Sequence, residues 1–193
     1  MTELPVPTPD YTRTVTAGNY GTICLPNGSS NYTGAEFYEF VGKEEGKAYL
    51  ASVTTLEAGV PYIFRATASE VAVYSDGTTA ATPGEHNGLV GTFTDDTEVT
   101  VGNYILFNNA ICEVTAPCWV NSNRAYIVWD EIPAGAPQQM PGRRYIGLDV
   151  HGENGTTGLD NIMITDAPVK AIENGQLIII RNGEKYNVQG VRL

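Results

Sequence analysis

The chain has 193 residues, of which 42% are hydrophobic and 17% charged, a balance that is typical of a folded globular protein rather than a disordered one. Its 22 acidic and 11 basic residues give a formal net charge of −11, which argues against binding to nucleic acid or to an anionic membrane. The sequence contains no apolar run long enough to span a bilayer as a helix.

The N-terminal residues 1–10 contain prolines at every second position from Pro5 to Pro9. They lack the basic region and apolar core of a signal peptide. We interpret residues 1–10 as a semi-rigid linker, and we expect the chain to be a module cut from the end of a longer polypeptide.

Residues 11–168 show strand signals and almost no helix signals. No window of about a dozen residues holds a 3.6-residue apolar period free of Gly or Pro. Strand formers instead recur between turn residues, which predicts an all-β fold, an antiparallel β-sandwich of the jelly-roll or Ig-like kind. The expected strands cover residues 11–16, 20–26, 35–41, 48–53, 61–67, 70–74, 88–94, 98–101, 104–107, 111–114, 119–120, 124–129 and 143–150, with a further short strand within 160–168.

Residues 169–193 read as a C-terminal β-hairpin. Asn182-Gly183 is the preferred pair for a two-residue type I′ turn, because both residues tolerate positive φ. A two-residue loop fixes the register, so Arg181 pairs with Glu184 and each earlier residue pairs with a later one: Ile180 with Lys185, Ile179 with Tyr186 and Leu177 with Val188. An isolated hairpin is marginally stable in water, so this one is expected either to dock on the preceding domain or to be recognised by another protein.

The charge changes sign near this hairpin. From Lys170 onward four basic and two acidic residues give a net charge of +2, which leaves −13 for the preceding residues. The change suggests a separate functional unit, although a hairpin docked on an acidic domain would show the same pattern.

The three cysteines are Cys24, Cys112 and Cys118, and an odd number leaves at least one unpaired. Cys112 and Cys118 flank a five-residue stretch that could form a hairpin loop. Either the two form a cross-strand disulfide, or all three cysteines are small buried hydrophobic residues. Their spacing matches no zinc site, and we expect neither a metal nor a cofactor.

Catalytic signals are absent or nonspecific. His86 and His151 fall in expected loops without a second histidine nearby, so we interpret both as surface residues. Six carboxylates could act in pairs on a glycan, but side chains of this kind at strand ends are more often solvated. They are Asp95, Asp96, Asp130, Glu131, Asp149 and Glu153. The Gly-rich stretch from His151 to Asn161 contains oxygen ligands that suit Ca²⁺, but it does not match an EF-hand loop, and a structural loop is favoured.

Aromatic side chains are the candidate ligand contacts. Trp119 follows Cys118 at a loop edge and is the better candidate for an exposed platform on which a sugar could stack, whereas Trp129 lies in an apolar strand. Core packing is the competing interpretation for both tryptophans.

Several stretches resemble a C-terminal β-sandwich module of secreted or surface proteins of gut Bacteroidota. They are residues 20–26, 33–38, 58–64, 102–106, 123–126 and 141–144. Residues 174–180 and 185–190 are similar to the last hairpin of sorting domains read by the type IX (Por) secretion system, although a full sorting domain is a small sandwich of its own. The resemblance implies secretion or surface display and transfers no catalytic residue.

These observations favour a non-catalytic module that acts as a spacer or adhesion domain, with a C-terminal hairpin that docks or serves as an export address. The alternative is a carbohydrate-binding module, and a glycan-active enzyme ranks third. The expected partners are a glycan or a host or bacterial surface protein, and the secretion machinery for the hairpin, with no nucleic acid. An exposed, coplanar pair of aromatic side chains would favour carbohydrate binding, and the absence of such a pair from the surface would count against it.

Overall fold

The computed structural model describes residues 8–77, 80–138, 140 and 142–150, and the backbone alone of 151, 169–173, 176–181 and 184–187. The chain divides into two compact units, Met1–Asn161, here called the body, and Ile162–Leu193, here called the C-terminal unit. The described residues contain no α-helix, only one turn of 3-10 helix, η1 (Trp129–Glu131). No helix in this part of the chain has the length and apolar character needed to cross a membrane. The all-β fold class predicted from the sequence is confirmed.

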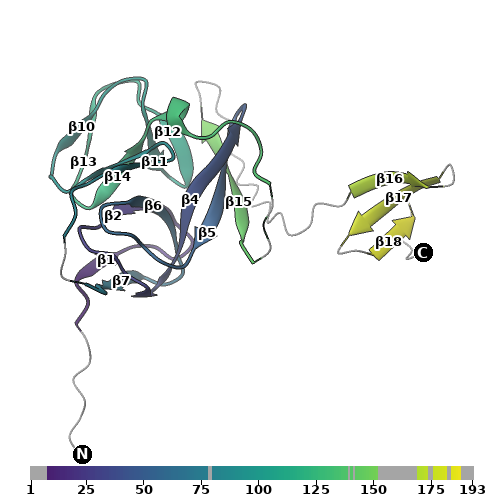
Figure 1. The fold of residues 1–193 in the computed structure, drawn as a ribbon. Helices are drawn as coiled ribbons and strands as arrows, with labels where there is room; N and C mark the ends of the chain where they lie inside the picture. The colour runs from purple at the N-terminus through teal and green to yellow at the C-terminus, as the bar shows by residue number, and fades with distance from the viewer. Residues whose placement is uncertain are drawn as a thin grey trace, which may run out of the picture. The chain divides into compact units, whose positions relative to one another are not determined.

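The body contains a series of short strands separated by turns (Figure 1). Their bounds are β1 (Tyr11–Thr14), β2 (Tyr20–Cys24), β3 (Asn31–Thr33), β4 (Ala35–Glu44), β5 (Lys47–Val53), β6 (Pro61–Ala66), β7 (Glu70–Tyr74), β8 (Glu85–His86), β9 (Leu89–Thr92), β10 (Thr97–Val99), β11 (Tyr104–Phe107), β12 (Ala110–Glu113), β13 (Cys118–Val120), β14 (Arg124–Ile127) and β15 (Tyr145–His151).

Most of these strands form one long sheet in the order β2-β6-β4-β5-β15-β12-β11-β14-β9-β8. Every neighbouring pair is antiparallel except β12 and β15, which run parallel with Ile111 opposite Val150. A second sheet has the order β1-β7-β3, and β10 pairs with β13 as a two-stranded ribbon. The architecture is therefore a β-sandwich, as predicted, with one parallel pairing that the strand pattern did not reveal.

The long sheet folds back so that its edge strand β2 lies beside β14 (Figure 1). The backbone N–H of Cys24 donates to the carbonyl of Asn123 at 3.2 Å. The Thr22 hydroxyl donates to the Ala125 carbonyl at 2.8 Å and accepts from the Ala125 N–H at 3.0 Å. These contacts satisfy polar groups along the edge of β2, which would otherwise be left unpaired.

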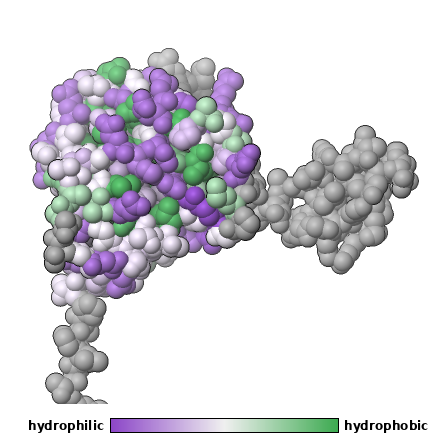
Figure 2. All heavy atoms as spheres, viewed as in Figure 1, coloured by the Kyte–Doolittle hydropathy of each residue, from purple (hydrophilic) through white to green (hydrophobic). Residues whose placement is uncertain are grey.

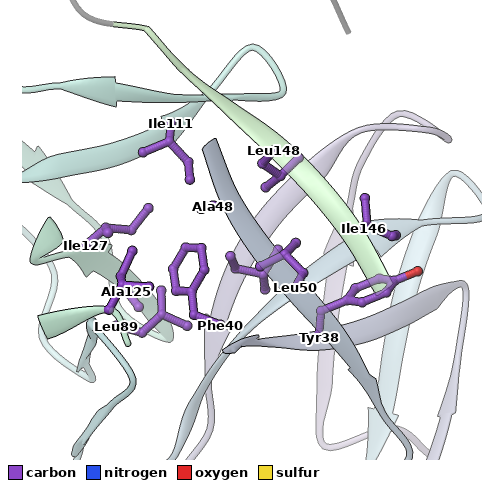
Figure 3. Packing of buried hydrophobic residues seen from close by; sticks show 12 residues of the cluster. Tyr38, Phe40, Ala48, Leu50, Leu89, Ile111, Ala125, Ile127, Ile146 and Leu148 are labelled. Carbon is purple, nitrogen blue, oxygen red and sulfur yellow. The ribbon is translucent and has the colours of Figure 1, made fainter. Parts of the chain in front are cut away.

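The larger core fills the space that this folding encloses. In Figure 3, Phe40, Leu50 and Leu148 project toward side chains of the opposite strands, among them Leu89 and Ile127. All five side chains are at most 2% exposed. Burial of such aliphatic and aromatic side chains is the main favourable term in folding.

A second core lies on the other face of β2, β6 and β4, where the β1-β7-β3 sheet covers it. Phe37, Phe64 and Val73 are its most deeply buried members alongside Ile23 and Val71. Because β6 has a core on each face, its Tyr62, Ile63 and Phe64 are all buried. This explains why β6 reads as a continuous apolar run rather than an alternating one.

Several strand limits differ from the sequence prediction. The strand expected to reach Trp129 ends at Ile127, because the chain turns into η1. Strand β3 lies inside a stretch expected to be a loop, and the β4–β5 hairpin is longer than expected, with β4 reaching Glu44. The short strand expected within 160–168 falls outside the described residues.

The C-terminal unit contains a three-stranded antiparallel sheet with the order β16 (Val169–Glu173), β17 (Gln176–Arg181) and β18 (Glu184–Asn187). The pairs Arg181–Glu184, Ile180–Lys185 and Ile179–Tyr186 occur in the register that the two-residue loop predicts. Asn182, Gly183 and Val188 themselves lie outside the described residues. Strand β16 was not predicted, so the expected hairpin forms part of a larger sheet.

Candidate ligand-binding groove

A groove of about 300 Å³ lies where β2, β11, β13 and β14 meet the side chain of Arg13 from β1. Residues from five strands line it, although Arg13 and Arg124 are far apart in the sequence. A volume of this size is at the small end of the range for small-molecule sites. Rigid strands hold its lining side chains, which favours a preformed site.

Two large aromatic side chains are exposed in this groove. Trp119 is 59% exposed and Phe107 is 58% exposed. The described body has only two other large hydrophobic side chains with comparable exposure, Val101 and Met140. Elsewhere on the body, hydrophilic side chains dominate the face seen in Figure 2, with hydrophobic ones scattered among them. Exposed aromatic groups that share one hollow commonly mark a binding surface.

Local backbone structure sets the positions of both aromatic residues. Phe107 ends β11 and pairs with Ala110 across a turn whose two residues, Asn108 and Asn109, have φ of 48° and 65°. Asn tolerates this left-handed region better than most residues. The Asn109 side chain accepts a hydrogen bond from the Tyr20 N–H at 2.8 Å, which ties the turn to the start of β2.

Trp119 lies in the middle of β13, opposite Glu98 of β10. The two strands form a ribbon separate from the long sheet, and within the described part of the chain no third strand pairs with β13. Asp95, just before β10, and Ser122, just after β13, link the two chain ends of the ribbon: the Asp95 carboxylate accepts from the Ser122 N–H at 2.9 Å and from its hydroxyl at 2.7 Å. These bonds lower the pKa of Asp95.

Two guanidinium groups, of Arg13 and Arg124, complete the groove. Arg13 Nη1 donates to the Thr22 carbonyl at 3.1 Å, and its guanidinium lies 5.2 Å from the centroid of the Phe64 ring. The pKa of Arg13 is lowered, first by burial and then by the positive charge of Arg124, against a smaller raising effect of Tyr11. The two side chains are therefore close enough to repel each other.

The support beneath Arg13 depends on a glycine. An added Cβ at Gly21 would meet the Phe64 ring at 2.6 Å. The absence of a side chain at Gly21 thus lets the Phe64 ring lie across β2, where it stacks under the guanidinium of Arg13. A cation–π contact of this kind contributes roughly 0.5–1 kcal/mol or more when partly desolvated.

Trp129 lies in η1, away from this groove, and is partly buried against the larger core. Its ring is 5.6 Å from that of Tyr104, and Lys43 Nζ lies 5.3 Å from its centroid. The same ammonium group donates to the Trp129 carbonyl at 2.5 Å. A shallow hollow of about 480 Å³ adjoins these residues, but Lys43 already covers the ring of Trp129. The two tryptophans thus occupy different sites.

The histidine that sequence analysis placed at the surface is half-buried in a charge network. His86 Nε2 and Glu39 Oε2 are 2.6 Å apart, and Arg143 donates to Glu39 Oε1 at 2.6 Å. Burial acts to raise the pKa of Glu39, but the hydrogen bonds from His86 and Arg143 outweigh it and lower the pKa. The network joins β4 and β8 to the residues before β15, which is a stabilising arrangement. The side chain of His151 lies outside the described residues.

The carboxylates considered for catalysis are distributed over separate places. Asp95 bonds Ser122, Asp149 lies 4.0 Å from Lys47, and Asp130 lies 3.8 Å from Lys43 while being almost fully exposed. Glu153 and most of the Gly-rich stretch 151–161 lie outside the described residues. The described residues contain no cluster of three or more His, Cys, Asp or Glu side chains that could hold a metal ion.

All three cysteines are free. The proposed bridge between Cys112 and Cys118 is absent because the two lie in different sheets, Cys112 opposite Ile105 and Cys118 opposite Val99. Cys24 is fully buried, and burial raises its pKa to about 11. The alternative interpretation, buried small hydrophobic residues, describes Cys24 but not the two partly exposed cysteines.

The residues that complete the groove were missed by sequence analysis. Trp119 was named, but Phe107, Arg13 and Arg124 were not. The fold and this groove define an all-β protein with an exposed aromatic and cationic hollow. Comparisons with known proteins add no identification: no family model, no curated protein and no solved structure matches the chain.

Proposed function

We propose that the chain is a non-catalytic β-sandwich module of a secreted or surface-exposed bacterial protein, which adheres to a glycan through the groove lined by Phe107 and Trp119. The observation that carries the proposal is the placement of these two exposed aromatic side chains in one preformed hollow. Aromatic faces provide large apolar contact area at low cost in conformational entropy, which suits the apolar face of a sugar ring.

Adhesion is favoured over a pure spacer role because a spacer has no need of exposed aromatic groups in a hollow. Catalysis is disfavoured because, among the described residues, those that line the groove include no carboxylate, histidine or cysteine. Hydrolysis of a glycosidic bond ordinarily needs two carboxylates on either side of the scissile bond. Secretion or surface display follows only from the resemblance of the sequence to modules of gut Bacteroidota.

The test is a glycan array probed with the full chain, followed by isothermal titration of any glycan that binds. Trp119→Ala and Phe107→Ala should each weaken binding by about tenfold or more, since removal of a buried aromatic contact costs roughly 1–3 kcal/mol. Val101→Ala is the matched control, because Val101 is 58% exposed and lies outside the groove. Binding that is unchanged in both aromatic variants would contradict the proposal.

The C-terminal unit is proposed to contribute to export. Two observations support this role. The β17–β18 pair has the register of the hairpin that resembles a sorting signal, and the strands belong to a compact unit of their own. Removal of residues 162–193 tests the role in export. A deletion that began at Gly175 would remove β17 and leave β16 without its partner strand, so the whole unit is removed instead. Loss of export with an unchanged melting temperature of the body would support an address. Normal export of the shortened chain would contradict the proposal.

A further inference from the structure

Among the described residues of the body, most basic side chains lie next to a carboxylate, but two of them do not. Seven Lys and Arg side chains lie in the described part of the body, and five of them form an ion pair with Asp or Glu. Within the same residues, Arg13 and Arg124 alone form none. Both line the same groove, in a chain that has twice as many acidic as basic residues.

Two neighbouring cations without a counter-charge are unfavourable, and this unfavourable interaction is relieved when an anion binds between or beside them. Arg13 donates one N–H to the Thr22 carbonyl and also hydrogen-bonds the Tyr11 side chain, whereas no hydrogen bond of the Arg124 side chain is found among the described residues. A guanidinium group offers five N–H donors in a planar fork, so several donors remain available for a ligand. That fork matches a carboxylate with two parallel hydrogen bonds.

We propose that the glycan held in this groove carries a carboxylate, as a hexuronic or sialic acid residue does, with the sugar ring against Trp119 and Phe107 and the carboxylate on Arg124 and Arg13. This inference rests on the proposed glycan adhesion. The groove of about 300 Å³ is suited to one ring with its acidic group rather than to a long chain.

The net charge of the protein also restricts how densely charged the ligand can be. The net charge of −11 repels a polyanion such as nucleic acid or a densely sulfated chain along its whole length. A single carboxylate that contacts both guanidinium groups is repelled less by the acidic protein, because charges beyond about 8 Å are screened at physiological salt. A ligand with sparse carboxylates therefore suits the groove better than a densely charged one.

Isothermal titration of the full chain with five probes tests the inference. The carboxylated probes are a galacturonic acid trisaccharide and 3′-sialyllactose, and the neutral ones are the carboxyl-reduced trisaccharide and lactose, with dextran sulfate as the fifth. We expect at least one carboxylated probe to bind about tenfold or more tightly than its neutral counterpart, because charge-assisted hydrogen bonds are the stronger kind. Which of the two binds identifies the source of the acidic sugar.

Arg124→Gln should abolish the preference for the carboxylated probe over its neutral counterpart. Arg144→Gln is the control, because it removes the same charge from an exposed arginine that pairs with Glu36 outside the groove, and it should leave the preference intact. Arg13→Lys provides a second variant that keeps the charge but loses the fork, and it should weaken the preference as well. Thermal melts of all three variants verify that they fold.

The outcomes separate the two proposals. Equal binding of acidic and neutral probes, or a preference that survives Arg124→Gln, would overturn the acidic-sugar inference while leaving glycan adhesion in place. Dextran sulfate binding as tightly as the carboxylated probes would overturn the choice of carboxylate. If no glycan binds on the array or in solution, both proposals fail together.

Discussion

The hydroxyl of Thr22 bonds both backbone groups of Ala125, donating to the carbonyl at 2.8 Å and accepting from the N–H at 3.0 Å. The two residues are 103 positions apart, and Thr22 is 7% exposed. This side chain replaces the backbone pairing that β2 lacks along β14. It also joins the two strands that contribute Tyr20 and Arg124 to the groove.

Thr22→Val should lower the free energy of unfolding by about 2 kcal/mol, because it leaves a buried donor and acceptor of Ala125 without a partner. Valine has almost the same shape, so the loss isolates the hydrogen bonds from packing. Urea denaturation measures the change. Thr22→Ser keeps the hydroxyl and should lose less. A Thr22→Val variant as stable as the unmodified protein would show that the two hydrogen bonds do not stabilise the fold.

Gly91→Ala should destabilise the body by about 1–3 kcal/mol, the usual cost of an overpacked core. The added Cβ would meet Cys24 Sγ at 2.4 Å and Cys24 Cβ at 3.0 Å, in the space where β9 passes β2. Cys24→Ala in the same chain should recover part of the loss, which a double-mutant cycle measures. Gly77→Ala is the control, since nothing lies within 4 Å of its added Cβ. A Gly91 variant as stable as the Gly77 variant would contradict the packing of Cys24.

Glu39→Gln should make the stability of the protein less dependent on pH in the acid range. The pKa of Glu39 is lowered in the folded protein, so its ionised form stabilises the fold above the unfolded-state pKa of about 4.3. That stabilisation is lost as the pH falls through the lower folded-state pKa. Unfolding measured from about pH 6 down to about pH 2 should therefore give a shallower decline for the variant.

Glu45→Gln serves as the control for this series, because Glu45 is exposed in the β4–β5 turn and belongs to none of the ion pairs found among the described residues. Its profile should match that of the unmodified protein. If the stability of Glu39→Gln declines with falling pH as steeply as that of the unmodified protein, the His86–Glu39–Arg143 network does not persist in solution.

Titration of the native protein with a disulfide-forming thiol reagent at about pH 8 should modify Cys112 and Cys118 but spare Cys24. The first two are free and partly exposed, whereas Cys24 is fully buried and has a pKa of about 11, so it forms little thiolate at that pH. Unfolding should expose the third thiol. If neither Cys112 nor Cys118 reacts under these conditions, the two cysteines are not free thiols, and a disulfide between them would have to be considered again.

Strand positions and the register of the β17–β18 pair could be predicted from sequence, because alternation and Asn-Gly turns act over a few residues. Strand β16 was missed although a second Asn-Gly pair, Asn174-Gly175, follows it. That pair was the available signal. The parallel pairing of Ile111 with Val150 depends on the path of the whole chain, which no local pattern encodes.

The groove was predictable only in part. Trp119 stood out because a tryptophan next to a loop edge has no obvious place in the core. Arg13 and Arg124 did not, because an arginine becomes informative only when its lack of a carboxylate partner is known. That property depends on the positions of all the acidic side chains in the folded body, which sequence spacing does not give.

Acrylamide quenching of tryptophan fluorescence tests the binding surface most directly, because the chain has two tryptophans and Trp119 is the exposed one. In a Trp129→Phe background, saturation with a glycan that binds in titration should shield Trp119 and lower its quenching constant by about half or more, as expected for a ring covered by ligand. Glycan binding that leaves the quenching of Trp119 unchanged would place the ligand elsewhere and contradict the account.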